Sequence, residues 1–135
     1  MLPLALFSAG LASACGTTPP APAAPSVVAP TTTETFAGTL TVGGTQFYSF
    51  SVAQYGTVNV TLASLDGSDS SPLQVTLAMG RPAARVCREG SAVTTAPGAA
   101  AQLTGTFDPG VYCAQVSDIG TLTGSTTFVV TIAHP

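Results

Sequence analysis

The sequence contains no lysine and no tryptophan, and charged residues make up only 7% of it. An average soluble domain has about 25% charged residues, so something other than charge must keep this chain in solution. Its 21 threonines and 12 serines supply the polar surface. Three arginines against six acidic residues leave a formal net charge of −3. This balance excludes a basic nucleic-acid-binding surface, and the missing lysines exclude a P-loop or Schiff-base lysine.

The first 14 residues are apolar and uncharged, which is typical of the hydrophobic part of a secretion signal. The run is shorter than the roughly 20 apolar residues of a transmembrane helix. Two cleavage patterns overlap at its end. Ala12-Ser13-Ala14 fits an A-x-A signal-peptidase site, and Leu11-Ala12-Ser13-Ala14-Cys15 resembles a bacterial lipobox whose leucine stands one position early. We therefore expect a signal peptide over residues 1–14.

Cysteine numbers bear on the choice between these patterns. The three cysteines are Cys15, Cys87 and Cys113, and an odd cysteine in an exported protein needs an explanation. Pairing Cys87 with Cys113 leaves Cys15 at the expected cleavage point, where lipidation would use its thiol. Export also favours a disulfide over two free thiols. We predict both modifications, and the alternative is a soluble secreted protein whose Cys15 is unmodified.

Residues 15–33 combine the lipidated cysteine with a linker rich in proline, threonine and alanine. The linker has five prolines and no charge. Proline-rich tracts favour extended polyproline II, which rises about 3.1 Å per residue. We expect a spacer that holds a domain away from a membrane. Residues 34–135 form that domain, and a segment of this length can build one hydrophobic core.

Beyond residue 34 apolar and polar residues alternate with a period of two, which indicates half-buried strands. Glycine-rich and Asp-Pro-Gly turns separate the runs, and shorter strands are expected over Thr35–Val42 and Gln102–Phe107. About seven strands with one apolar face need a second sheet to cover that face. The sequence therefore predicts an all-β, antiparallel β-sandwich. The apolar sets expected in its core are Tyr48/Phe50/Val52, Val58/Val60/Leu62, Leu73/Val75/Leu77, Tyr112/Ala114/Val116 and Phe128/Val130/Ile132.

The order of the strand motifs carries a family resemblance. Phe36-Ala37-Gly38-Thr39-Leu40 leads into Tyr48-Ser49-Phe50-Ser51-Val52, and Gly110-Val111-Tyr112-Cys113-Ala114-Gln115-Val116 precedes a closing strand over residues 128–132. This succession resembles the bacterial pre-peptidase C-terminal (PPC) domain. Gln46 stands where that family often has an acidic residue. The resemblance implies a jelly-roll-like sandwich of seven to eight strands, export, and a non-catalytic accessory or binding role.

Arg81, Arg85 and Arg88 hold the whole positive charge of the chain within eight residues. We expect the disulfide to pin a loop around Arg85–Gly90 onto the outside of the sandwich. The three arginines would then form a small cationic patch that contacts an anionic partner. The alternative is an ordinary solvated loop.

Asp66 and Asp69 share a serine-rich loop, residues 64–71. Calcium takes such oxygen ligands, although it usually needs more carboxylates. The alternative is a turn in which these side chains bond the local backbone. No other cofactor is indicated. His134 is the one histidine, and we expect it to lie in a frayed terminus.

Together these features predict a non-catalytic bacterial cell-envelope lipoprotein. It would present a β-sandwich binding module on a proline-rich stalk, at the membrane or cell surface. Its partners would be the membrane, through the lipid, and a protein or envelope polymer, but no nucleic acid. The alternative is a secreted structural or accessory spacer with no specific ligand, and an enzyme is a third class. A distinct exposed patch would favour binding, and a uniform threonine and serine surface would favour the spacer.

Overall fold

The computed structural model describes residues 16, 19–22, 30–67 and 73–135. These residues contain eight strands, which are β1 (Thr32–Leu40), β2 (Thr45–Val52), β3 (Gly56–Asp66), β4 (Val75–Ala83), β5 (Val86–Thr95), β6 (Leu103–Phe107), β7 (Gly110–Asp118) and β8 (Thr126–His134). Within the described ranges no helix is long and apolar enough to cross a membrane.

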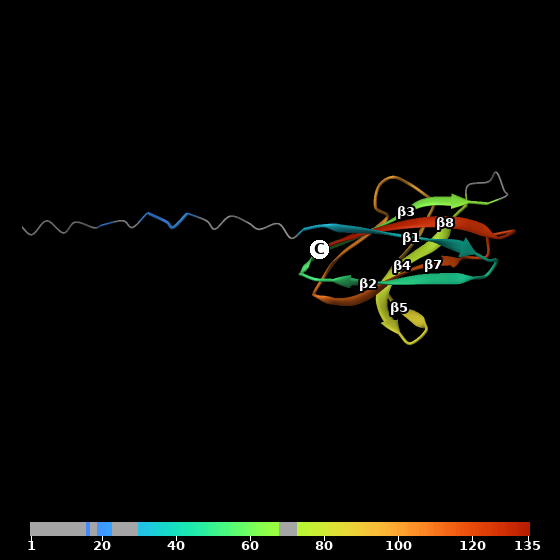
Figure 1. The fold of residues 1–135 in the computed structure, drawn as a ribbon. Helices are drawn as coiled ribbons and strands as arrows, with labels where there is room; N and C mark the ends of the chain where they lie inside the picture. Colours follow the sequence, from blue (N-terminus) through green and yellow to red (C-terminus); the bar gives the residue numbers. More distant parts are fainter. Residues whose placement is uncertain (1–15, 17–18, 23–29, 68–72) are drawn as a thin grey trace, which may run out of the picture.

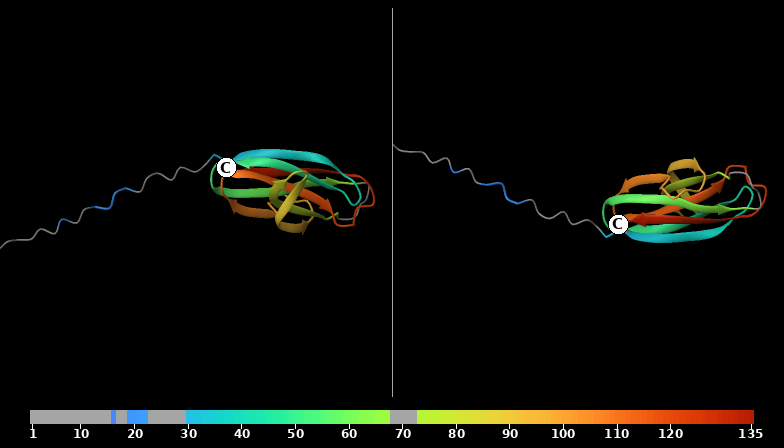
Figure 2. Two further views of the ribbon diagram at one scale, coloured as in Figure 1. Left: turned by 90° about the horizontal axis from the view of Figure 1, so that it is seen from below. Right: turned by 90° about the horizontal axis from the view of Figure 1, so that it is seen from above.

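The strands form two four-stranded antiparallel sheets that pack face to face (Figures 1 and 2). One sheet has the order β1-β8-β3-β6, and the other has the order β2-β7-β4-β5. Each sheet turns an apolar side toward the other, and packing the two sheets together removes these sides from water. The predicted all-β sandwich is confirmed.

The strand pairs are nested. β1 pairs with β8, β2 with β7, β3 with β6 and β4 with β5. The chain therefore follows one long folded hairpin whose successive arms alternate between the two sheets, which is the jelly-roll arrangement. The β4–β5 hairpin is the tip of this long hairpin. Its two open ends meet at the other extreme, where Thr32 lies opposite His134. In Figure 1 the start of β1 therefore lies beside the C-terminus.

The core contains residues of all the predicted alternating sets, together with Leu40, Met79, Leu103 and Leu122, which those sets omitted. Phe50 is 3% exposed while Ser49 beside it faces solvent, so the predicted faces are correct. Tyr48 and Leu73 are half-buried and pack against the core. A shift of one residue would turn each set to the surface, so burial fixes the register. The core residues are Leu40, Phe50, Val52, Val58, Val60, Leu62, Val75, Leu77, Met79, Leu103, Tyr112, Ala114, Val116, Leu122, Phe128, Val130 and Ile132.

The loop predicted around Arg85–Gly90 is wrong, because β5 begins at Val86 and is a regular partner of β4. β5 is an edge strand, and most of its side chains are exposed, so it lacks the apolar alternation of a half-buried strand. The hairpin turn is also atypical. Ala84 has a φ of 56°, a position where hairpins usually place glycine or asparagine. β1 begins at Thr32, so the sheet also includes two residues that the sequence analysis gave to the linker.

Candidate binding groove at the arginine hairpin

A backbone irregularity shapes the β4–β5 hairpin, which projects from the sandwich (Figure 1). A β-bulge shifts the β4–β5 register between Met79 and Gly80. A Cβ at residue 80 would overlap the carbonyl oxygen of Arg88. Glycine therefore allows the two strands to approach closely where the bulge bends the hairpin.

A disulfide fixes the bent hairpin to the sandwich. It joins Cys87 on β5 to Cys113 on β7, with their Cα atoms 5.9 Å apart. β4 lies between these two strands in the sheet order, and flat neighbouring strands are already about 4.8 Å apart. The hairpin must therefore bend toward β7 for the sulfur atoms to meet. Both cysteines are buried. The predicted pairing is confirmed, but it pins a strand rather than a loop.

The structure divides the predicted arginine patch. Arg81 on β4 lies directly opposite Arg88 on β5, and both line a groove. Arg85 lies in the hairpin turn and does not line that groove. Like charges that face each other across an antiparallel pair destabilise it. In the part of the chain that the structure describes, no carboxylate forms an ion pair with either arginine of the groove.

Tyr112 holds the Arg81 side chain in place. Arg81 Nη2 donates a hydrogen bond of 3.3 Å to Tyr112 Oη, and the guanidinium carbon lies 4.8 Å from the centre of the ring. Tyr112 Oη in turn donates to the carbonyl oxygen of Asp108 at 2.8 Å. A tyrosine hydroxyl that bonds backbone a few residues upstream is the tyrosine corner of other β-sandwiches. The sequence predicts only a turn and a core position here, although the run Asp108-Pro109-Gly110-Val111-Tyr112 is a signal for this corner.

The groove is open and has a volume of about 520 Å³. It lies between the bent part of the β4–β5 hairpin and the end of β6. Its apolar wall includes Phe107, whose ring meets Tyr112 edge-on with centroids 4.7 Å apart. The lining residues are Met79, Gly80, Arg81, Arg88, Gly90, Ser91, Thr106, Phe107, Asp108 and Tyr112. Two arginines, hydroxyl-bearing residues, one aspartate and two aromatic residues therefore line one hollow.

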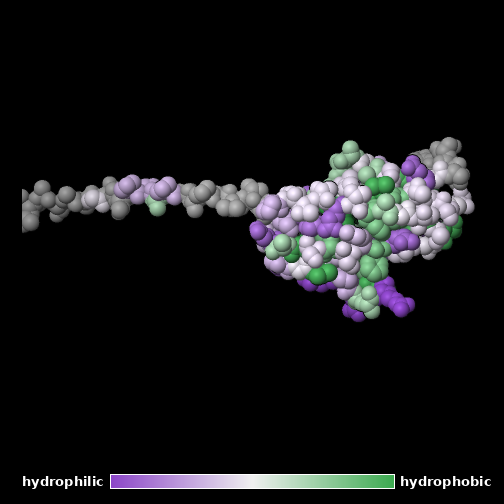
Figure 3. Space-filling model, viewed as in Figure 1, coloured by the Kyte–Doolittle hydropathy of each residue, from purple (hydrophilic) through white to green (hydrophobic). Residues whose placement is uncertain are grey.

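The groove has an excess of positive charge. Glu89 is next to Arg88 in sequence, but its Oε1 accepts a hydrogen bond from Gln115 Nε2 at 2.8 Å, and it does not line the groove. Asp108 is the one acidic residue among the lining residues. In Figure 3 hydrophilic side chains extend from the projecting hairpin, while much of that face has intermediate hydropathy. An anion meets local attraction here on a chain whose net charge is −3.

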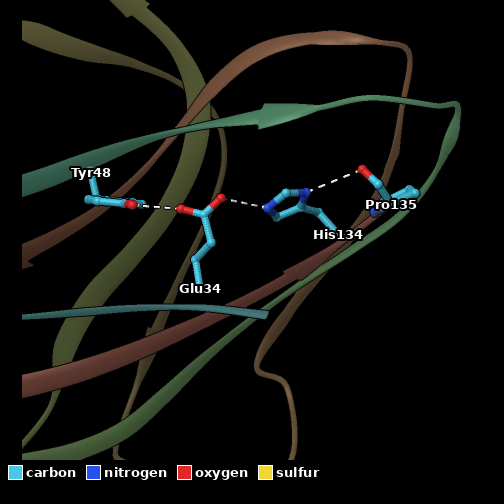
Figure 4. Close-up of polar contacts among 4 residues, drawn as sticks. All are labelled: Glu34, Tyr48, His134 and Pro135. Atoms are coloured by element: carbon cyan, nitrogen blue, oxygen red, sulfur yellow. Dashed lines mark hydrogen bonds and ion pairs between the residues drawn. The ribbon is translucent and has the colours of Figure 1, made fainter. Parts of the chain in front are cut away.

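A second polar cluster joins β1, β2 and β8 (Figure 4). Tyr48 Oη donates to Glu34 Oε2 at 2.6 Å, and His134 Nε2 lies 2.9 Å from Glu34 Oε1. His134 Nδ1 lies 3.2 Å from the Pro135 oxygen. The expectation of a frayed terminus is wrong, because His134 is in β8 and only 4% exposed. Both ring nitrogens contact these oxygens, so the cluster binds strands together.

The contacts of this cluster also change its acid–base properties. The hydrogen bond from Tyr48 and then that from His134 hold the pKa of Glu34 below its usual value. The bond to Glu34 raises the pKa of Tyr48. The carboxylate therefore stays ionised at the junction of the two sheets.

Asp118 ties together two loops at the other end of the sandwich. Its Oδ2 accepts from the Gly43 N–H at 2.7 Å, and its Oδ1 accepts from Gly120, Thr121 and Leu122. These bonds to the ionised carboxylate, led by the one from Gly43, lower the pKa of Asp118. The sequence showed only a loop between glycines, so this anchoring residue was missed.

Some predicted sites lie partly or wholly outside the described residues. Asp66 is exposed at the end of β3, but Asp69 lies outside, so the calcium site stays a prediction. Among the described residues no three histidine, cysteine or acidic side chains form a group that could hold a metal ion. Cys15 and the signal peptide over residues 1–14 also lie outside.

No protein-family model and no curated protein matches the chain. The groove, the disulfide and the N-terminal sequence pattern are therefore the observations that bear on its function.

Proposed function

We propose that the protein is a non-catalytic binding module of a bacterial cell envelope, carried on a proline-rich stalk and held at the membrane by a lipid on Cys15. The groove carries the binding part of this proposal. Arg81 and Arg88 face each other without a carboxylate partner in the described structure. Such an arrangement costs stability by itself, and an anionic ligand would offset that cost through charge-assisted hydrogen bonds.

Three further observations support the location. The buried Cys87–Cys113 disulfide suits an oxidising compartment outside the cytoplasm. The first 14 residues and Cys15 follow the pattern of a lipoprotein signal. The eight-stranded jelly roll agrees with the fold that the resemblance to PPC domains implies, and we propose membership of that family on this basis.

A test of binding to envelope material distinguishes the proposed binding module from a spacer without a ligand. The full chain is incubated with purified envelope from a bacterium, and the bound fraction is measured at low salt. The test protein carries Arg81→Gln and Arg88→Gln, and the control carries Arg85→Gln in the same hairpin. A binding module loses most of its capture in the double variant and little in the control. Equal capture by all three proteins contradicts binding through the groove, and capture of none contradicts the binding function.

The lipid anchor has a separate test. The mature protein is extracted from membranes, and its intact mass is measured. We expect a chain that begins at Cys15 and carries the added mass of a diacylglycerol and an acyl chain, since more than one chain is needed for stable anchoring. A product that begins at Cys15 without lipid contradicts the anchor and leaves the binding function to its own test.

A further inference from the structure

We propose that the groove binds a carboxylated saccharide, with the carboxylate of a uronic-acid unit between Arg81 and Arg88. This inference rests on the proposed binding function and names its ligand class. The distribution of charge favours an anionic ligand in this groove. All three cations of the chain lie between residues 81 and 88, and two of them face this hollow. Elsewhere the acidic residues outnumber the cations, so an anion is attracted here and not to the rest of the surface.

The geometry of the arginine donors suits a carboxylate. A guanidinium group has five N–H donors in a planar fork that matches a carboxylate. The bond to Tyr112 occupies one Arg81 donor, and the contact with the ring fixes the plane of the group. Arg81 is therefore positioned before the ligand arrives, while Arg88 supplies a second fork from the opposite strand. Positioning in advance lowers the entropy lost on binding.

The other residues that line the groove suit the ring and hydroxyls of a sugar. Ser91, Thr106, Asp108 and Phe107 line the groove, and these residue types carry hydroxyls, a carboxylate and an aromatic ring. Sugar hydroxyls both donate and accept, so one ring can bond the serine and threonine as well as Asp108. An ionised aspartate or glutamate side chain has only acceptors, so an acidic peptide could bond Asp108 only through its backbone N–H groups. The groove therefore fits an acidic saccharide better than an acidic peptide.

The aromatic residues of the groove limit the expected affinity for a sugar. Phe107 is half-buried and already meets Tyr112, so it offers only part of its face for stacking. Charge then carries most of the affinity. Binding should be weak at high ionic strength, because the two arginines are exposed to solvent.

The test is a titration of the oxidised full chain with a six-unit oligogalacturonate at low salt, followed by calorimetry or by NMR shifts. Arg81→Gln and Arg88→Gln should each weaken binding about tenfold or more, as expected for a lost charge-assisted bond. Arg85→Gln removes the same charge from the same hairpin but lies outside the groove, so it should leave the affinity almost unchanged. The same oligosaccharide with its carboxylates reduced to alcohols should bind far more weakly.

Several outcomes overturn the inference. If Arg85→Gln weakens binding as much as Arg88→Gln, the attraction is general and not located in the groove. If the reduced oligosaccharide or a hexaglutamate peptide binds equally well, the ligand class is wrong. If envelope capture depends on the two groove arginines but the oligogalacturonate does not bind, the saccharide assignment fails and the binding function stands. If capture fails as well, both fail.

Discussion

Phe50 and Ser49 are neighbours in β2 with opposite surroundings. Phe50 packs inside the sandwich near Tyr112 and His134, whereas Ser49 faces solvent. Phe50→Ala should lower the free energy of unfolding by about 3–5 kcal/mol, because it removes buried contacts and leaves a cavity. Ser49→Ala should change it by less than about 0.5 kcal/mol. Chemical denaturation measures both, and equal losses would show that the faces of β2 are assigned wrongly.

Asp118 should make the stability of the fold depend on pH. Its pKa is lowered in the folded protein, so the carboxylate stabilises the fold above the ordinary aspartate pKa, and this contribution is lost as the pH falls through the folded value. Asp118→Asn should lower the melting temperature at neutral pH, because the ionised acceptor of four backbone N–H groups is gone. The gap between the variant and the natural protein should close at strongly acidic pH. A gap that stays constant with pH would contradict the role of the charge.

At the scale of elements, the β4–β5 hairpin depends on its disulfide. The bridge closes a loop with a sequence separation of 26 and holds the bend that brings the arginines to the groove. Cys113→Ser should lower the free energy of unfolding by about 2–5 kcal/mol in oxidising buffer. In the presence of a reductant the difference should shrink, which serves as the control. A loss that is unaffected by reductant would assign the effect to packing at residue 113.

The strands that sequence predicts well are those with one buried face. Runs such as Val58, Val60 and Leu62 alternate because burial selects every second residue, and their faces were predicted correctly. β5 was not predicted, because burial does not select apolar residues at every second position of an exposed edge strand. The sequence also could not predict that Arg81 lies opposite Arg88, because this pairing depends on the register after the bulge at Gly80. Local periodicity does not encode which distant strand becomes a neighbour. The nested pairing of the strands therefore could not be predicted from it either.

At the scale of the whole molecule, the polar cluster of Glu34, Tyr48 and His134 links β1 to both sheets. The lowered pKa of Glu34 means that its stabilising effect is present above the ordinary glutamate pKa and is lost as the pH falls through the folded value. Glu34→Gln should speed hydrogen exchange of the β1 amides near Glu34 about two- to fivefold at neutral pH, as expected when a partly exposed hydrogen bond to an ionised carboxylate is weakened. Glu89→Gln is the matched control, because Glu89 lies on β5, which does not contact β1 in either sheet. Equal exchange in β1 for both variants would contradict the fastening role.

The in-register pairing of β1 with β8 decides how the domain responds to force. The ladder extends over nine residue pairs, from Thr32 opposite His134 to Leu40 opposite Thr126. When Thr32 is pulled while another part of the sandwich is held fixed, the force acts along β1. The hydrogen bonds between β1 and β8 then resist the force together, in shear. A pull on Thr32 against His134 acts across the same ladder and separates one pair at a time. Because the rate of forced unfolding follows the unfolding barrier, a domain tethered only through its N-terminal strand should outlast one stretched between its two ends.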